Sequence, residues 1–228
     1  MRRELADACW PDIEPGRVTV AVPVGALEQH GPHLPLDTDT RIAVAVAAAL
    51  PGVVTAPALA YGASGEHEAF AGTVSIGAEV LTSLVVEYGR SVCRWAQRVL
   101  FVNGHGGNAY PLARAVELLR YEGRDAAWLP CAIPGADAHA GITETSLMLH
   151  LAPHSVDMAR AAAGATEPIA TLMPRLRETG IVSVSANGVL GDPTAATADQ
   201  GAGLFAGLVE RAAAQVVRWQ PGAEGRLR

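Results

Sequence analysis

The chain has 228 residues, half of them hydrophobic, and a formal net charge of −6. The acidic balance and the lack of a basic stripe argue against nucleic acid as a partner, and no apolar run reaches the ~20 residues of a membrane span. The start, MRRELADACW, has no apolar core, and Cys9, Cys93 and Cys131 are too few and scattered for a disulfide framework, so we expect a cytoplasmic protein with reduced thiols.

Short valine-rich runs alternate with longer helical patterns along the chain. The runs predicted to be strands are 17–24, 52–59, 98–103, 126–131 and 180–186. They are continuously apolar, which is typical of strands buried on both faces. The helical patterns cover 42–50, 78–98, 110–124, 143–151 and 197–218. This alternation predicts an α/β sandwich with a mostly parallel sheet, as one domain over 1–228.

Ligands of such sheets bind beyond the carboxyl ends of the strands, and the first of these loops is GALEQHGPHLPLDTDT, residues 25–40. Glu28 and His30 are two residues apart, so in an extended segment they point to the same side. Together with Asp39 they suit a divalent metal such as zinc, iron(II) or manganese. The alternative is that Asp39 caps the following helix. His33 and Asp37 are interpreted as solvated or supporting residues.

The loop after the third predicted strand contains His105 within NGHGGN. The flanking glycines let the backbone approach a ligand and leave the imidazole uncovered, which favours a ligand over a structural histidine. A phosphate loop is excluded because the Gly-x-x-x-x-Gly-Lys pattern is absent.

The loop after the fourth predicted strand contains His139 and Glu144 within DAHAGITETS. Taken alone, Glu144 could simply complement a helix dipole, and His139 could be a surface histidine. All three loops together offer two glutamates, two histidines and an aspartate as ligands, enough for two metals if one carboxylate bridges them. Paired metals activate water and polarise a carbonyl, so the pattern predicts hydrolysis of an amide-type C–N bond.

A serine nucleophile is disfavoured because the chain has no Gly-x-Ser-x-Gly elbow. GASGEHE, residues 62–68, places Ser64, Glu66 and His67 close together in sequence. We interpret it either as a substrate-facing loop or as a plain polar turn.

The blocks PVGALEQHGPHLPLDTDT, NGHGGN and HAGITETS, in this order, resemble the signature blocks of the creatininase (creatinine amidohydrolase) family. The resemblance implies a three-layer α/β/α domain with two divalent metals per subunit, assembled as a homo-oligomer, a hexamer or similar ring of dimers. It implies that Glu28, Asp39 and His105 hold one metal, and that His30, Asp39 and Glu144 hold the other. His139 matches the histidine expected to act on the substrate.

One position departs from that pattern. Creatinine-cleaving members place a glutamate ligand two residues after the histidine of NGH, where this chain has Gly107. The fifth ligand must therefore come from elsewhere, and Glu144 is predicted to supply it. The departure also argues against creatinine as the substrate.

YGASGEHEAFAGTVSIG, LLRYEGRDAAW and VLGDPTAATADQG resemble the branch of this family that acts in mycofactocin biosynthesis. Its members are peptidases that remove the modified C-terminal Val-Tyr unit from a ribosomally made precursor peptide. On this basis Tyr61, Ser64 and His67 are predicted to contact substrate, and Phe70 either contacts it or belongs to the core. The alternatives are an amidohydrolase acting on a small cyclic amide or formamide, and a non-catalytic metal-binding scaffold. Carboxylate and imidazole ligands admit zinc, iron, manganese or cobalt.

Overall fold

A computed structural model describes residues 4–228, and a parallel four-stranded sheet lies at its centre. The strand order is β2-β1-β3-β4, with all three neighbouring pairs parallel. The bounds are β1 Thr19–Val24, β2 Val53–Thr55, β3 Arg98–Asn103 and β4 Ala126–Pro130. Val20 of β1 is in register with Val54 of β2 and Val99 of β3. Four of the five predicted strands are therefore present, with β2 shorter than expected.

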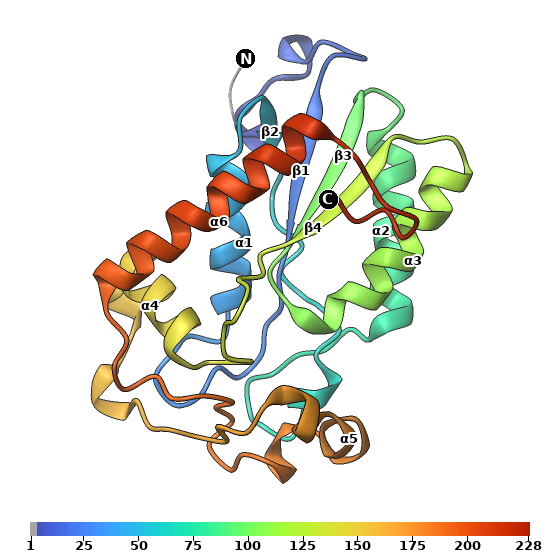
Figure 1. The fold of residues 1–228 in the computed structure, drawn as a ribbon. Coiled ribbons are helices and arrows are strands. Elements are labelled where there is room, and N and C mark those ends of the chain that lie inside the picture. The colour runs from blue at the N-terminus through green and yellow to red at the C-terminus, as the bar shows by residue number, and fades with distance from the viewer. Residues whose placement is uncertain (1–3) are drawn as a thin grey trace.

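Helices cover both faces of the sheet, as Figure 1 shows. On one side lie α1 (Thr38–Ala49), α4 (Ile142–Leu151) and α6 (Ala198–Arg218). On the other side lie α2 (Ala78–Val92) and α3 (Ala109–Tyr121). This arrangement confirms the predicted three-layer α/β/α sandwich and its parallel sheet.

Successive strand residues enter different cores because side chains of a strand alternate between its faces. Val20 and Val22 of β1 and Phe101 of β3 belong to the core that includes α2 and α3. Ala21 of β1 and Leu100 of β3 belong to the core that includes α1, α4 and α6. The continuously apolar runs of the sequence therefore reflect burial on both faces.

The predicted strand at 180–186 is wrong. Ile181–Ser183 forms a 3₁₀ helix, η7, directly after a helix that the sequence patterns did not reveal, α5 (Ile169–Thr179). Gly180, with φ +73°, makes the turn between the two helices. Ile181 then packs against Leu172 and Leu176 of α5 instead of joining the sheet. Its apolar side chain is thus buried in a separate small core.

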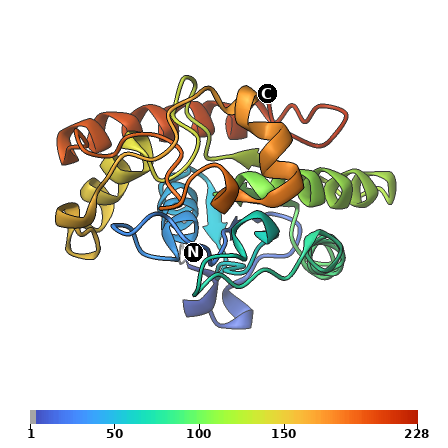
Figure 2. The ribbon, with the colours of Figure 1, turned by 90° about the horizontal axis from the view of Figure 1, so that it is seen from below.

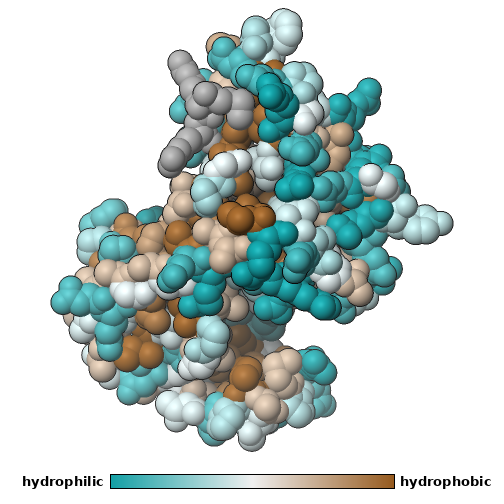
Figure 3. Space-filling view, turned by 45° about the horizontal axis from the view of Figure 1, so that its top comes forward, coloured by the Kyte–Doolittle hydropathy of each residue, from teal (hydrophilic) through white to brown (hydrophobic). Residues whose placement is uncertain are grey.

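Helix α5 lies at one end of the molecule, away from the central sheet and its two helical layers (Figures 1 and 2). On the face shown in Figure 3, hydrophilic side chains predominate on the α2 and α3 side, and apolar ones are more frequent on the α4 and α6 side. Among the residues that the structure describes, no helix is both long enough and apolar enough to span a bilayer.

Candidate metal centre

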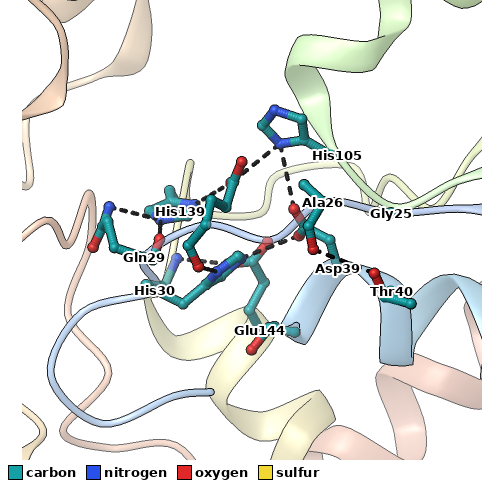
Figure 4. A network of polar contacts seen from close by, with 12 residues as sticks. Gly25, Ala26, Gln29, His30, Asp39, Thr40, His105, His139 and Glu144 are labelled. Atoms are coloured by element: carbon teal, nitrogen blue, oxygen red, sulfur yellow. Dashed lines mark hydrogen bonds and ion pairs between the residues drawn. The ribbon is translucent and has the colours of Figure 1, made fainter. Parts of the chain in front are cut away.

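The carboxyl ends of β1 and β3 and the segment after β4 bring the predicted ligands together (Figure 4). Glu28 and His30 follow β1, and Asp39 lies in the first turn of α1. His105 follows β3, and Glu144 lies in the first turn of α4. Helix α1 begins at Thr38 with Asp37 before it, so Asp39 is inside the helix and is not its cap.

Glu28, Asp39 and His105 form a buried group. Nδ1 of His105 lies 3.1 Å from Oε1 of Glu28 and 3.3 Å from Oδ2 of Asp39. Both carboxylate oxygens of Glu28 and Oδ2 of Asp39 are buried without a hydrogen-bond partner. Buried carboxylates without hydrogen bonds are costly unless a cation compensates them. These unsatisfied oxygens fit a metal ion.

Main-chain carbonyls indicate which ring nitrogens of two histidines carry a proton. Nε2 of His105 lies 3.1 Å from the carbonyl of Ala63, and Nδ1 of His30 lies 3.1 Å from the carbonyl of Glu28. A carbonyl only accepts, so each of these nitrogens donates. In a neutral ring the other nitrogen then directs its lone pair at a carboxylate. This is the arrangement of metal-binding histidines.

Asp39 lies between the two predicted ligand groups. Its Oδ1 is 3.1 Å from Nε2 of His30, and its Oδ2 is 3.3 Å from Nδ1 of His105. Each oxygen thus faces a different histidine, as a bridging carboxylate would require.

Glu144 lies on the His30 side of the centre. Its Oε2 is 3.9 Å from Nε2 of His30 and accepts a hydrogen bond from the backbone N–H of Ala140 at 2.6 Å. The ligand atoms of His30, His139 and Glu144 lie within 4.8 Å of one another. His139, only 8 % exposed, therefore lies beside the second ligand group and is not a surface histidine.

In the metal-free chain, protons compensate the buried charges. Burial opposes protonation of His30, but the Asp39 carboxylate outweighs it and raises the pKa of His30 to about 10. Glu28 and Asp39 likewise raise the pKa of His105 well above its usual value against the effect of burial. Burial raises the pKa of Glu28, and it raises that of Glu144 to about 7. Imidazole and carboxylate donors of this kind suit zinc, iron or manganese.

Two cavities adjoin the centre. The larger, ≈ 860 Å³, is lined by Asp39, His105 and Glu144 and by residues of α5. The smaller, ≈ 340 Å³, shares His105 and Glu144 with it and extends toward Trp128 and Arg226. The ligand candidates His105 and Glu144 therefore line both cavities.

The three residues predicted to contact substrate lie in different surroundings. His67 is buried at 2 % exposure, lines the larger cavity, and places Nε2 3.2 Å from Oε1 of Glu28. Ser64 is fully buried, Tyr61 is 49 % exposed, and neither lines either of the two cavities. Phe70 packs in the small core beside α5.

The two residues predicted to have supporting roles, His33 and Asp37, lie outside the groups of possible metal ligands that residues 4–228 form. His33 is buried, with Nε2 2.8 Å from the hydroxyl of Thr145 on α4. Asp37 pairs with Arg41 at 2.7 Å on α1. Neither contributes to the clusters of possible metal ligands among the residues that the structure describes.

Sequence reasoning missed Gln29. Its side-chain nitrogen Nε2 lies 2.9 Å from Nδ1 of His67 and 3.1 Å from Nε2 of His139. Figure 4 shows Gln29 beside His139. Its position between Glu28 and His30 in sequence is the only signal that could have drawn attention to it.

The fold and site define an α/β/α sandwich protein with a buried carboxylate–imidazole centre at the carboxyl end of a parallel sheet. Residues 6–216 match the sequence model of the creatininase family, which is described as creatinine amidohydrolase. The chain therefore belongs to the creatininase family. It is 57 % identical over 217 residues to the mycofactocin precursor peptide peptidase of Mycolicibacterium smegmatis, covering 91 % of this chain and 88 % of that protein. It is 32 % identical over 193 residues to the creatinine amidohydrolase of Pseudomonas putida, covering 68 % and 74 % of the two chains. A solved structure titled "Creatininase Mn" superposes with a TM-score of 0.80 at 27 % identity, over 97 % of this chain and 100 % of that chain.

Proposed function

We propose that the chain is a dinuclear metal-dependent peptidase that releases the modified C-terminal Val-Tyr unit from the mycofactocin precursor peptide. The main support for a dinuclear site is the orientation of Asp39, which directs one carboxylate oxygen toward His30 and the other toward His105. The substrate is inferred from the 57 % identity to a protein of that name.

Under this proposal Glu28, Asp39 and His105 hold one metal, and His30, Asp39 and Glu144 hold the other. Divalent metals at such a site supply Lewis acidity and an activated water. The ring nitrogens of His30 and His105 that face the carboxylates must be unprotonated to bind. Their other nitrogens donate to main-chain carbonyls, which fixes the orientation of both rings.

His139 is suited to accept a proton and deliver it to the leaving amine. It lines the larger cavity beside Glu144. Burial lowers the pKa of His139 well below its usual value. The imidazole is therefore neutral, as a proton acceptor must be.

The larger cavity fits a compact apolar group. Ile169, Met173 and Leu176 of α5, with Ile181 and Leu190, give the cavity an apolar wall, and Arg177 and Glu178 of α5 also line it. Its volume of ≈ 860 Å³ falls within the range of small-molecule sites. We infer that this wall receives the aromatic Val-Tyr unit.

Gly107 argues against creatinine as the substrate. A Cβ at this position would lie 2.3 Å from the carbonyl oxygen of Ala63 and 2.5 Å from Nε2 of His105. No side chain fits there without displacing His105, so a glutamate ligand at this position is incompatible with this arrangement of the loop.

The test is to incubate metal-loaded protein with the modified precursor peptide and to identify the products by mass spectrometry. We expect release of the Val-Tyr-derived unit and its loss in Glu28→Gln, which removes one ligand charge while keeping the shape. Turnover of a small lactam without peptide cleavage would instead support a cyclic amidohydrolase. If Glu28→Gln leaves cofactor maturation unchanged, the chain is a non-catalytic scaffold.

A further inference from the structure

The side-chain amide of Gln29 has one orientation only. Its Oε1 accepts a hydrogen bond from the backbone N–H of Gly31 at 2.9 Å, and its Nε2 donates to the carbonyl of Gly188 at 3.1 Å. Because a backbone N–H only donates and a carbonyl only accepts, these partners fix which end of the amide is oxygen and which is nitrogen. The amide nitrogen has one further hydrogen to donate.

That second hydrogen points to His67. Nε2 of Gln29 lies 2.9 Å from Nδ1 of His67, so Nδ1 is the acceptor of this bond. A neutral imidazole with an accepting Nδ1 carries its proton on Nε2. This protonated Nε2 of His67 lies 3.2 Å from Oε1 of Glu28, although the two atoms do not form a hydrogen bond.

This proton decides whether His67 is a metal ligand. The ligand atoms of Glu28, His67 and His139 lie within 4.8 Å of one another, so distance alone would admit a third metal group. A metal at Nε2 of His67 would require a lone pair on that nitrogen and a proton on Nδ1. The amide of Gln29 opposes that proton because it donates to Nδ1.

The main chain of Gln29 also places the proton of His139 on Nε2, but in His139 it is the unprotonated nitrogen that faces the centre. Nε2 of His139 lies 2.8 Å from the carbonyl oxygen of Gln29, so Nε2 carries the proton and Nδ1 is free. This free nitrogen faces the centre, 3.9 Å from Oε1 of Glu28. The approach of the Gln29 amide nitrogen to Nε2 of His139, 3.1 Å, is then a contact of two donors and not a hydrogen bond.

We propose that Gln29 is a positioning residue that fixes the proton of His67 on Nε2, the ring nitrogen nearer Glu28, and so keeps His67 out of the metal-ligand set. The polar N–H group of His67 then lies beside the Glu28 carboxylate and favours its charged form. His139, set by the main chain of the same residue, keeps an accepting nitrogen toward the centre. The inference uses the metal site of the proposed function but requires no particular substrate.

The direct test is the protonation of the histidine ring nitrogens in the zinc-loaded protein, measured by ¹⁵N–¹H correlation NMR. Signals are assigned with His67→Phe and His139→Phe. We expect wild-type His67 to be unprotonated at Nδ1 and protonated at Nε2. In Gln29→Glu a carboxylate replaces the donor, so Nδ1 of His67 becomes protonated while His139 is unchanged. A proton on Nδ1 of His67 in the wild-type protein would overturn the proposal.

A second test measures zinc affinity by competition with a chelator. Gln29→Met removes the donor at similar volume and should weaken binding about 10–100-fold, as expected for the loss of a supporting contact. In a His67→Phe background the same substitution should have no further effect, because Gln29 acts through His67. An equal loss in both backgrounds would show a general structural role and refute the proposal. These readouts are independent of peptide cleavage, so a wrong substrate assignment leaves the inference testable.

Discussion

Nε2 of His30 lies 3.1 Å from Oδ1 of Asp39, and both side chains are almost fully buried. The other ring nitrogen of His30 is held by the carbonyl of Glu28. A neutral His30 therefore turns a lone pair toward a carboxylate oxygen, a repulsive contact unless a cation lies between them. Either a proton or a metal must be present, and the following predictions distinguish the two states.

Replacing Asp39 should remove both metals, because each of its oxygens serves a different ligand group. Asp39→Asn keeps the shape but loses the charge, so we expect loss of both metal equivalents and a fall in activity of at least about 100-fold. Metal content is measured by elemental analysis and activity by peptide cleavage. The matched control is Asp37→Asn in the turn before the same helix, which breaks only a surface pair with Arg41. Retention of both metals in Asp39→Asn would contradict a bridging role.

Glu144 should affect one metal only. Glu144→Gln is expected to lower the metal content from two equivalents to one, because Glu144 lies near His30 and belongs only to the second ligand group. Glu178→Gln is the control, since Glu178 is another carboxylate that lines the same cavity. Equal losses in the two variants would argue against a specific role for Glu144.

The metal-free protein should lose stability as the pH rises above neutrality. The pKa of His30 is raised from 6.5 to about 10, so the folded chain binds a proton that the unfolded chain releases. This stabilisation is complete below pH 6.5 and disappears as the pH approaches 10. We expect the Tm of the metal-free protein to fall across this window by at least about 2–4 °C, the effect of 1 kcal/mol in a chain of this size.

The metal-loaded protein provides the comparison for that measurement. Metal binding requires His30 and His105 to be unprotonated, so the contribution from their protons is absent when metal is bound. Its Tm should therefore depend less on pH over the same window. Parallel Tm curves for the two forms would show that these histidines are not the ligands.

Gly107 and Gly106 offer a matched pair on one loop. A Cβ at Gly107 would collide with the carbonyl of Ala63 and with Nε2 of His105, whereas a Cβ at Gly106 has nothing within 4 Å. Gly107→Ala should therefore displace His105 and weaken metal binding about 10–100-fold, and Gly106→Ala should leave it unchanged. Affinity is measured by chelator competition. If both variants bind metal like the wild type, the loop does not constrain His105 as the structure implies.

Much of the architecture could be predicted from local patterns. The runs at 17–24 and 98–103 indicate strands buried on both faces, because only a sheet covered by two layers buries every residue of a strand. The segment at 180–186 shows the limit of this reasoning. Ile181 is buried against α5 and not in the sheet, and a short apolar run does not reveal which neighbour will cover it.

The residue pattern alone is enough to predict an α/β sandwich that gathers glutamate, aspartate and histidine at the carboxyl ends of its strands. Parallel strands end at one edge of a sheet, so residues after different strands must meet there. The role of each imidazole, in contrast, depends on contacts that form only in the folded chain. The carbonyl of Ala63 orients the ring of His105. The carbonyl of Gly188 orients the amide of Gln29, and this amide determines which ring nitrogen of His67 carries the proton. Proton positions depend on such partners, which are distant in sequence and adjacent only after folding.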